Sequence, residues 1–287
     1  MNSQDITRAL IDTTVARAMV EMDADPKRSV RKLCDLGRQF SRGRFQNQIF
    51  AIFQDLLRND ESPYYQAIDF LLRSNDPEAL RQFGINIGYN SFTYGAQILR
   101  QKQKELSFAV PWVVKLRLDS RIPDTYDSSF FASVVRTGLT YGIYSYQLRS
   151  MDHHEDMESY LAVIQSHPEC AFLWFLSDTP LTEKQQKLLL SCPNLMVSLP
   201  IDAPSTASMA KALRHQKTLF GMHKVYQDAD AAAYLLSFDH LYSQMVSVGF
   251  RSGNVDVVLK KIADRYEENT NRRLQSIIAI LEPTLVI

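Results

Sequence analysis

Five short runs rich in β-branched and aromatic residues constrain the fold of this 287-residue chain more than any other feature. Segments with helical periodicity separate the runs, whose starts lie about 25 to 30 residues apart. Strands that alternate with helices at this spacing form βαβ units, and each crossover makes neighbouring strands parallel. The runs are WVVKLRL, GIYSYQL, AFLWFLS, LMVSLP and FGMHKVY, which start at Trp112, Gly142, Ala171, Leu195 and Phe220. Five units cannot close an eight-stranded barrel, so the sequence predicts an open or partial β/α barrel with mostly parallel strands.

The chain before these runs has the pattern of amphipathic helices. Apolar residues recur there with a period near 3.6, first around Leu10 to Met19 and again after a break at Asp25-Pro26. Further apolar stripes lie in FQNQIFAIFQDLL and YYQAIDFLL. The sequence therefore predicts a helical N-terminal region over residues 1–105.

Three glycines, Gly84, Gly88 and Gly95, loosen the helical pattern before the first strand. They do not have the spacing of a phosphate-binding loop after a strand. We expect them to mark places where helices pack closely.

The last part of the chain changes character again after about residue 240. Apolar residues mark one face of a long amphipathic helix, and Asn254 is a plausible N-cap for it. The residues of that face are Val255, Leu259, Ile262, Tyr266, Leu274, Ile277, Leu281 and Leu285. We divide the α/β chain into a helical region (1–105), a partial β/α barrel (106–238) and a helical tail (239–287).

Charge and hydropathy exclude several classes of protein. Lys plus Arg and Asp plus Glu both total 32, and a nucleic-acid partner is not expected without a basic excess. The N-terminal MNSQDITRAL lacks the apolar core of a signal peptide. The sequence contains no run of 18 apolar residues, so it predicts no membrane span. We expect a cytoplasmic location.

The three cysteines, Cys34, Cys170 and Cys192, are odd in number and far apart in sequence. This spacing argues against a disulfide framework and against a thiolate metal cage. No cysteine is flanked by cationic residues that would lower its pKa. The sequence predicts no metal site and no cofactor.

Polar residues follow four of the predicted strands. Ligands of parallel α/β sheets bind at the carboxyl ends of strands, so Arg149, Asp178, Asp202 and Asp228 are candidates for a ligand-binding mouth. The alternative is that each Asp caps the helix that follows, with Asp178 and Asp202 as the best caps. Both interpretations stay open at this stage.

The histidines give weaker signals. Adjacent His153 and His154 point in different directions and make a poor metal pair, so we expect a solvated loop. His167 is expected to end a helix, and His223 to be a core residue or a wall of the mouth. No serine lies in a nucleophile-elbow pattern or has an obvious histidine partner.

Seven segments between residues 20 and 235 follow one another in a recognisable order: DADPKRSVRKLCDL, SPYYQAIDFLLRSNDPEALRQFGIN, SFAVPWVVKL, FFASVVRTGLTYGIYSYQL, HPECAFLWFLSDTPLTEKQQKLL, NLMVSLPID and KTLFGMHKVYQD. On these segments, residues 20–235 resemble a group of bacterial radical S-adenosylmethionine (SAM) proteins. The resemblance implies a partial (β/α)₆ barrel.

The signature motifs of that family are missing here. Where the family has the CxxxCxxC loop that binds a [4Fe–4S] cluster, this chain has LDSRIPDTYDSSFF, without a cysteine. The Gly-Gly-Glu-Pro motif that holds SAM is replaced by Tyr146-Gln147-Leu148-Arg149. No catalytic, cofactor-binding or metal-binding residue of the family can be carried over, so the resemblance implies a degenerate barrel, a pseudoenzyme.

The tail carries a specific set of residues: Gly249, Ser252-Gly253-Asn254-Val255-Asp256, Ala263-Asp264, Tyr266-Glu267-Glu268, Arg273 and Leu281-Glu282-Pro283. On these positions, residues 241–287 are similar to the end of the cytoplasmic domain of type II secretion system F proteins, the inner-membrane platform of bacterial secretion and type IV pilus machines. The resemblance implies platform proteins as partners and, as an option, a location peripheral to the inner membrane. An amphipathic tail also suggests a homodimer.

These features favour a non-catalytic binding or scaffold protein over an enzyme. One alternative is an enzyme with altered chemistry at the strand ends, acting on a polar or phosphorylated metabolite. Another is a truncated relic without a selected function.

Overall fold

The computed structural model describes residues 3–22, 24–41, 44–118, 127–150 and 157–224. The chain divides into residues 1–224 and residues 225–287, and the described residues all belong to the first of these units. The predicted tail over 239–287, Asn254, Asp228, His153 and His154 lie outside the described residues.

The centre of the described unit is a parallel five-stranded sheet with the order β1-β2-β3-β4-β5. Each strand therefore lies beside its neighbour in sequence, as in a partial β/α barrel, and the predicted fold class is confirmed. The strands are β1 (Val113–Leu118), β2 (Ser145–Ser150), β3 (Ala171–Phe175), β4 (Leu195–Pro200) and β5 (Phe220–His223). Strand β2 begins later than expected because Gly142, with φ of 84°, still forms the turn after the preceding helix.

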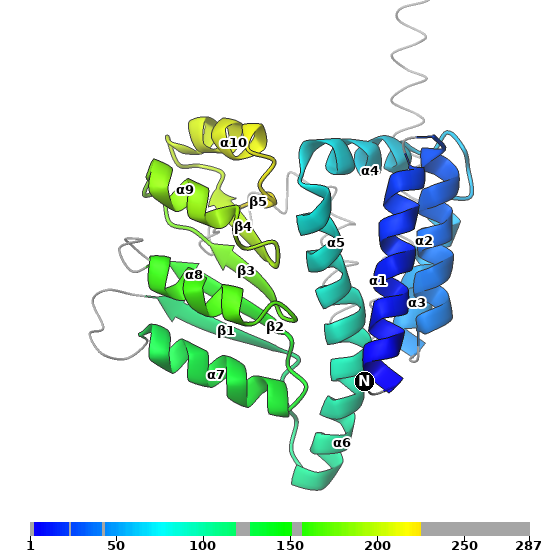
Figure 1. Cartoon of the computed structure of the whole chain (residues 1–287), viewed down its shortest axis with the longest axis horizontal. Helices are drawn as coiled ribbons and strands as arrows, with labels where there is room; N and C mark the ends of the chain where they lie inside the picture. Colours follow the sequence, from blue (N-terminus) through cyan, green and yellow to red (C-terminus); the bar gives the residue numbers. More distant parts are fainter. Residues whose placement is uncertain (1–2, 23, 42–43, 119–126, 151–156, 225–287) are drawn as a thin grey trace, which may run out of the picture. The chain divides into compact units, whose positions relative to one another are not determined.

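Four helices cover one face of this sheet (Figure 1). They are α7 (Ser128–Thr140), α8 (Met157–Ser166), α9 (Glu183–Leu189) and α10 (Thr206–His215), in the segments that the sequence predicts. Their apolar residues enclose Trp174 of β3, which is 1% exposed, together with Phe131 and Leu161. Full burial of one such side chain is worth about 1.5–3 kcal/mol, so this layer forms the main core.

The N-terminal region is helical as predicted. It contains α1 (Ser3–Glu21), α2 (Pro26–Phe40), α3 (Arg44–Leu56), α4 (Pro63–Ser74), α5 (Pro77–Ile85), the π-helix η1 (Asn86–Gly95) and α6 (Ala96–Leu106). Helices α2 and α5 each begin with a proline that follows an aspartate N-cap. The Asp25 side chain accepts a hydrogen bond from the Arg28 amide (3.0 Å), and the Asp76 side chain accepts one from the Ala79 amide (2.9 Å). None of the helices in the described ranges is both long and apolar enough to cross a membrane.

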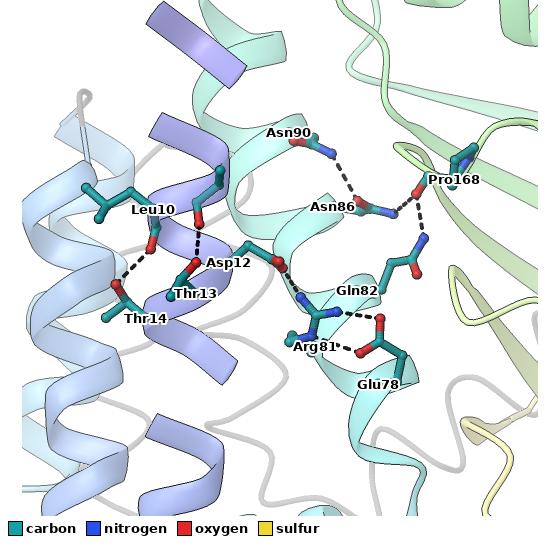
Figure 2. A network of polar contacts seen from close by, with 11 residues as sticks. Leu10, Asp12, Thr13, Thr14, Glu78, Arg81, Gln82, Asn86, Asn90 and Pro168 are labelled. Atoms are coloured by element: carbon teal, nitrogen blue, oxygen red, sulfur yellow. Dashed lines mark hydrogen bonds and ion pairs between the residues drawn. The ribbon is translucent and has the colours of Figure 1, made fainter. Parts of the chain in front are cut away.

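Helices α5, η1 and α6 follow one another without a break and lie along the amino ends of the strands (Figure 1). Asn86 is fully buried, and its Nδ2 donates to the carbonyl oxygens of Pro168 and Cys170 at 2.8 Å each. Asn90 Nδ2 donates to Asn86 Oδ1 (2.9 Å) and to the Glu169 carbonyl (2.8 Å), as Figure 2 shows in part. The two asparagines thus fasten the helical layer to the loop that enters β3.

The prediction that Gly84, Gly88 and Gly95 mark places of close helix packing is confirmed for Gly95 and wrong for the other two. A Cβ on Gly95 would lie 2.3 Å from the Gly142 carbonyl oxygen, so the helix does pack closely there. A Cβ on Gly84 or Gly88 would meet no atom within 4 Å. The sequence alone does not distinguish these cases, because a missing side chain permits either close contact or open space.

Candidate functional site

The face of the sheet opposite α7–α10, which we call the inner face, carries polar and basic side chains. Side chains alternate along a strand, so residues paired in register share a face. Arg117 pairs with Arg149, Arg149 with Phe175, and Phe175 with Ser198, so the row crosses β1 to β4 near their carboxyl ends. The guanidinium-bearing residues Arg117 and Arg149 are exposed.

Four residues form what we call the inner-face cluster: Arg149, Phe175, Ser198 and His223. Ser198 is 4% exposed, and its Oγ lies 3.0 Å from His223 Nδ1. The ring of Phe175 meets the His223 ring edge-on, with centroids 5.1 Å apart. Residues from four adjacent strands therefore meet at one place.

The surroundings of His223 disfavour its charged form. Desolvation lowers the pKa of His223 below its usual value, and the positive charge of Arg149 lowers this pKa further. Within the described ranges, no acidic side chain forms an ion pair with Arg149. An exposed guanidinium beside an imidazole and a hydroxyl is suited to bind an anionic or strongly polar group.

Three members of the predicted mouth lie among the described residues, at or just after the carboxyl ends of β2, β3 and β4. Arg149 lies on the inner face, whereas Asp178 and Asp202 are exposed in the loops after β3 and β4. Asp202 forms an ion pair with Lys224 at 3.4 Å. Asp228 belongs to the part of the chain that is not described.

The capping alternative is wrong for Asp178 and Asp202. Helix α9 begins at Thr182, whose hydroxyl accepts from the Gln185 amide (3.2 Å) while Gln185 Oε1 accepts from the Thr182 amide (2.9 Å). Helix α10 begins after Ser205, which makes no side-chain cap bond. The loops after β3 and β4 are long enough that Thr182 and Ser205, and not the aspartates, occupy the N-cap positions of α9 and α10.

The pairing of Ser198 with His223 was missed by sequence reasoning, which found no serine with a histidine partner. The two residues lie 25 positions apart and come together only through the register of β4 and β5. Inspection of inward positions on adjacent strands would have suggested the pair. His167 ends α8 as predicted, and its Nδ1 lies 2.9 Å from the Val163 carbonyl oxygen.

The cysteines lie away from the inner-face cluster and are unreactive. All three are free thiols, and burial raises the pKa of Cys34 and of Cys192 to about 11 and that of Cys170 further. In the part of the chain that the structure describes, no three His, Cys, Asp or Glu side chains are grouped so that they could hold a metal ion.

Comparison with known proteins gives one informative result. Residues 208–287 match the family described as type II secretion system (T2SS), protein F. No curated protein and no solved structure matches the chain. The match begins at residue 208, inside α10, whereas the residues that resemble this family in the sequence begin at about 241. The matched range therefore includes β5 of the described sheet.

Proposed function

We propose that this chain is a non-catalytic binding protein attached to a secretion or type IV pilus platform of bacteria. The match of residues 208–287 to the T2SS protein F family carries this proposal, because it suggests that the C-terminal part associates with secretion-system components. The location that follows is cytoplasmic and peripheral to the inner membrane. The α/β unit would then serve as a binding or scaffold module, and the tail as its attachment.

The barrel part of the proposal draws on the resemblance of residues 20–235 to radical SAM proteins. The consecutive strand order supports a partial barrel, and the cluster-binding loop has no cysteine. Anaerobic iron–sulfur reconstitution followed by SAM titration tests this part. Cluster absorbance together with SAM binding would overturn the degenerate-barrel interpretation.

Attachment through the tail can be tested on the full chain with two point variants. Leu259→Asn places an amide on the predicted apolar face, and Lys260→Asn is the matched control beside it. We expect the wild-type chain and Lys260→Asn to recover a T2SS platform protein after cross-linking. The amount recovered with Leu259→Asn should be lower by a factor of about ten or more. Equal recovery with both variants, or none with wild type, contradicts the proposal.

A homodimer is the second partnership that the tail suggests. Light scattering of the full chain measures it directly, and Leu259→Asn should shift a dimer towards the monomer. A wild-type monomer at all concentrations rules out this partnership without affecting attachment to the platform.

A second candidate function is recognition or turnover of a polar metabolite on the inner face. The observation that favours it is the cluster of Arg149 with the Ser198–His223 pair. Pyrophosphate is a suitable probe, because a guanidinium binds phosphate oxygens through two parallel hydrogen bonds. Arg149→Gln should weaken pyrophosphate binding by about tenfold or more, and Arg136→Gln, on the exposed side of α7, should leave it unchanged.

The Ser198–His223 pair alone gives little support to an enzyme. An activated serine needs a base that a third group orients, and no contact of His223 Nε2 with a carboxylate is found within the described ranges. The remaining alternative is a relic without function, for which the isolated chain should be poorly folded. Cooperative unfolding of the purified chain would count against it.

A further inference from the structure

The helical layer encloses a cavity of about 420 Å³. Helices α1 to α5 and the π-helix η1 contribute to its walls, which are almost entirely apolar. Protein interiors are close-packed and rarely leave voids much larger than a water molecule. A volume of this size lies within the range of small-molecule binding sites.

Two glycines keep the cavity open. Gly84 and Gly88 both line it, and a Cβ on either would meet no atom within 4 Å. Helix interiors normally disfavour glycine, because it loses more backbone entropy than alanine. Here neither position is packed against a neighbouring atom, and a π-helix, which is frequent at functional sites, begins between the two glycines.

The polar groups at the cavity wall are already engaged. Arg81 forms ion pairs with Asp12 on α1 and with Glu78 on its own helix (Figure 2). Thr93 Oγ1 donates to the Gly88 carbonyl at 3.1 Å. Because Arg81 is countered by two carboxylates, the wall does not offer an uncompensated guanidinium to an anionic ligand.

The rim of the cavity gives access from solvent. Phe53 and Leu71 line it and remain 47% and 46% exposed, whereas Met22 and Leu57 deeper in the wall are at most 7% exposed. Met19 and Met22 supply flexible thioether side chains that adapt to irregular ligands. Because the walls are almost entirely apolar, an apolar group is the ligand that restores the missing van der Waals contacts.

We propose that the cavity binds the hydrocarbon chain of an amphiphile, such as a fatty acyl chain, and recognises the chain and not the head group. The site is separate from the inner face and does not depend on the proposed platform function. Its ligand can come from a free amphiphile or from a membrane lipid.

The test uses the full chain and the fluorescent probe N-phenyl-1-naphthylamine. We expect saturable binding of the probe and displacement by dodecanol, dodecanoate and dodecylamine at similar concentrations. Displacement by these monomers identifies a free amphiphile, and displacement only by phosphatidylglycerol vesicles identifies a membrane lipid. Failure of all of them to displace the probe overturns the proposal.

Matched variants locate the probe. Gly84→Leu and Gly88→Leu fill the cavity and should weaken probe binding at least about tenfold while secondary structure is retained. Ala51→Leu introduces the same side chain at an exposed position of α3 and should leave binding unchanged. Equal probe affinity in all three variants would place the probe elsewhere and refute the site.

A gentler variant keeps the proposal testable if the leucine variants fail to fold. The double change of Gly84→Ala and Gly88→Ala adds two methyl groups where the structure has open space. It should weaken binding in the same direction by a smaller factor. Unchanged affinity in this folded variant would also contradict the proposal.

Discussion

The asparagine pair that fastens the helical layer to the sheet provides the most stringent test of the fold. Asn86 takes part in three hydrogen bonds, with Pro168, Cys170 and Asn90. A hydrogen bond of this type contributes about 1 kcal/mol net, and a buried carbonyl left without a donor costs about 1–3 kcal/mol. Pro168 keeps a second donor, Gln82 Nε2 at 2.9 Å, so only the Cys170 carbonyl is left without this side-chain donor. Asn86→Ala should therefore lower the free energy of unfolding by about 4 kcal/mol.

The neighbouring variant makes the prediction quantitative. Asn90 makes two hydrogen bonds, so Asn90→Ala should cost about 2 kcal/mol. The bond between Asn86 and Asn90 is lost in both single variants but only once in the double variant. The double variant should therefore fall short of additivity by about 1 kcal/mol.

Urea denaturation followed by Trp174 fluorescence measures these differences. Trp174 is buried in β3, and a Trp112→Phe background removes the exposed second tryptophan. Asn59→Ala is the control, because the Asn59 side chain accepts a single exposed local bond, from the Glu61 amide. We expect it to change the unfolding free energy by less than about 0.5 kcal/mol.

Asn86→Asp separates hydrogen bonding from side-chain size. It keeps the shape but replaces the donor group with an oxygen that faces two carbonyls, so it should destabilise at least as much as Asn86→Ala. Strict additivity of Asn86→Ala and Asn90→Ala, or a loss below about 1 kcal/mol for Asn86→Ala, would refute the docking geometry.

Three further predictions concern single positions. The hydroxyl of Thr218 is buried and has no hydrogen-bond partner among the described residues, so Thr218→Val should raise the free energy of unfolding by about 1 kcal/mol in the same urea assay. Thr206→Val loses a hydrogen bond to the Pro200 carbonyl and should lower the free energy of unfolding by a similar amount. The pKa of His223 is lowered in the fold, so the unfolded chain binds more protons at this residue. The stability due to His223 is therefore present above pH 6.5 and is lost as the pH falls. The difference in unfolding free energy between wild type and His223→Asn, measured from pH 8 to pH 5, should have this sign, and a reversed slope would contradict the prediction. Gly95→Ala should lower the melting temperature, because its Cβ would collide with a backbone carbonyl, whereas Gly84→Ala should raise it through helix propensity worth about 1 kcal/mol.

The sequence predicts the repeating parts of this fold well. Strands β1 to β5 and the helices between them follow from the alternation of two hydrophobic periods, which depends only on local spacing. The π-helix over Asn86–Gly95 could not be predicted, because its register depends on the Asn86 and Asn90 contacts with a loop about eighty residues away.

The candidate site was predicted less completely, for a related reason. Arg149 was identified because it ends a strand, but the inward direction of Ser198 and His223 depends on the register between β4 and β5. The capping alternative fails for Asp178 and Asp202 because loop length, which decides the capping residue, is not encoded in the strand pattern. Thr182 with Gln185 does have the spacing of a capping box, and it was the better signal.

The long separation between the asparagine pair and its carbonyl partners has a consequence for synthesis of the chain. The helical layer leaves the ribosome first, but Asn86 cannot form its hydrogen bond to the Cys170 carbonyl until that residue, 84 positions further along, has been synthesised. At ordinary rates of translation this delay is roughly 4–17 s. During that time the amides of Asn86 and Asn90 and the face around them are open to water and to chaperones. We therefore expect the nascent helical layer to remain undocked until β3 emerges, and a stall in translation before Pro168 to favour capture by chaperones over folding.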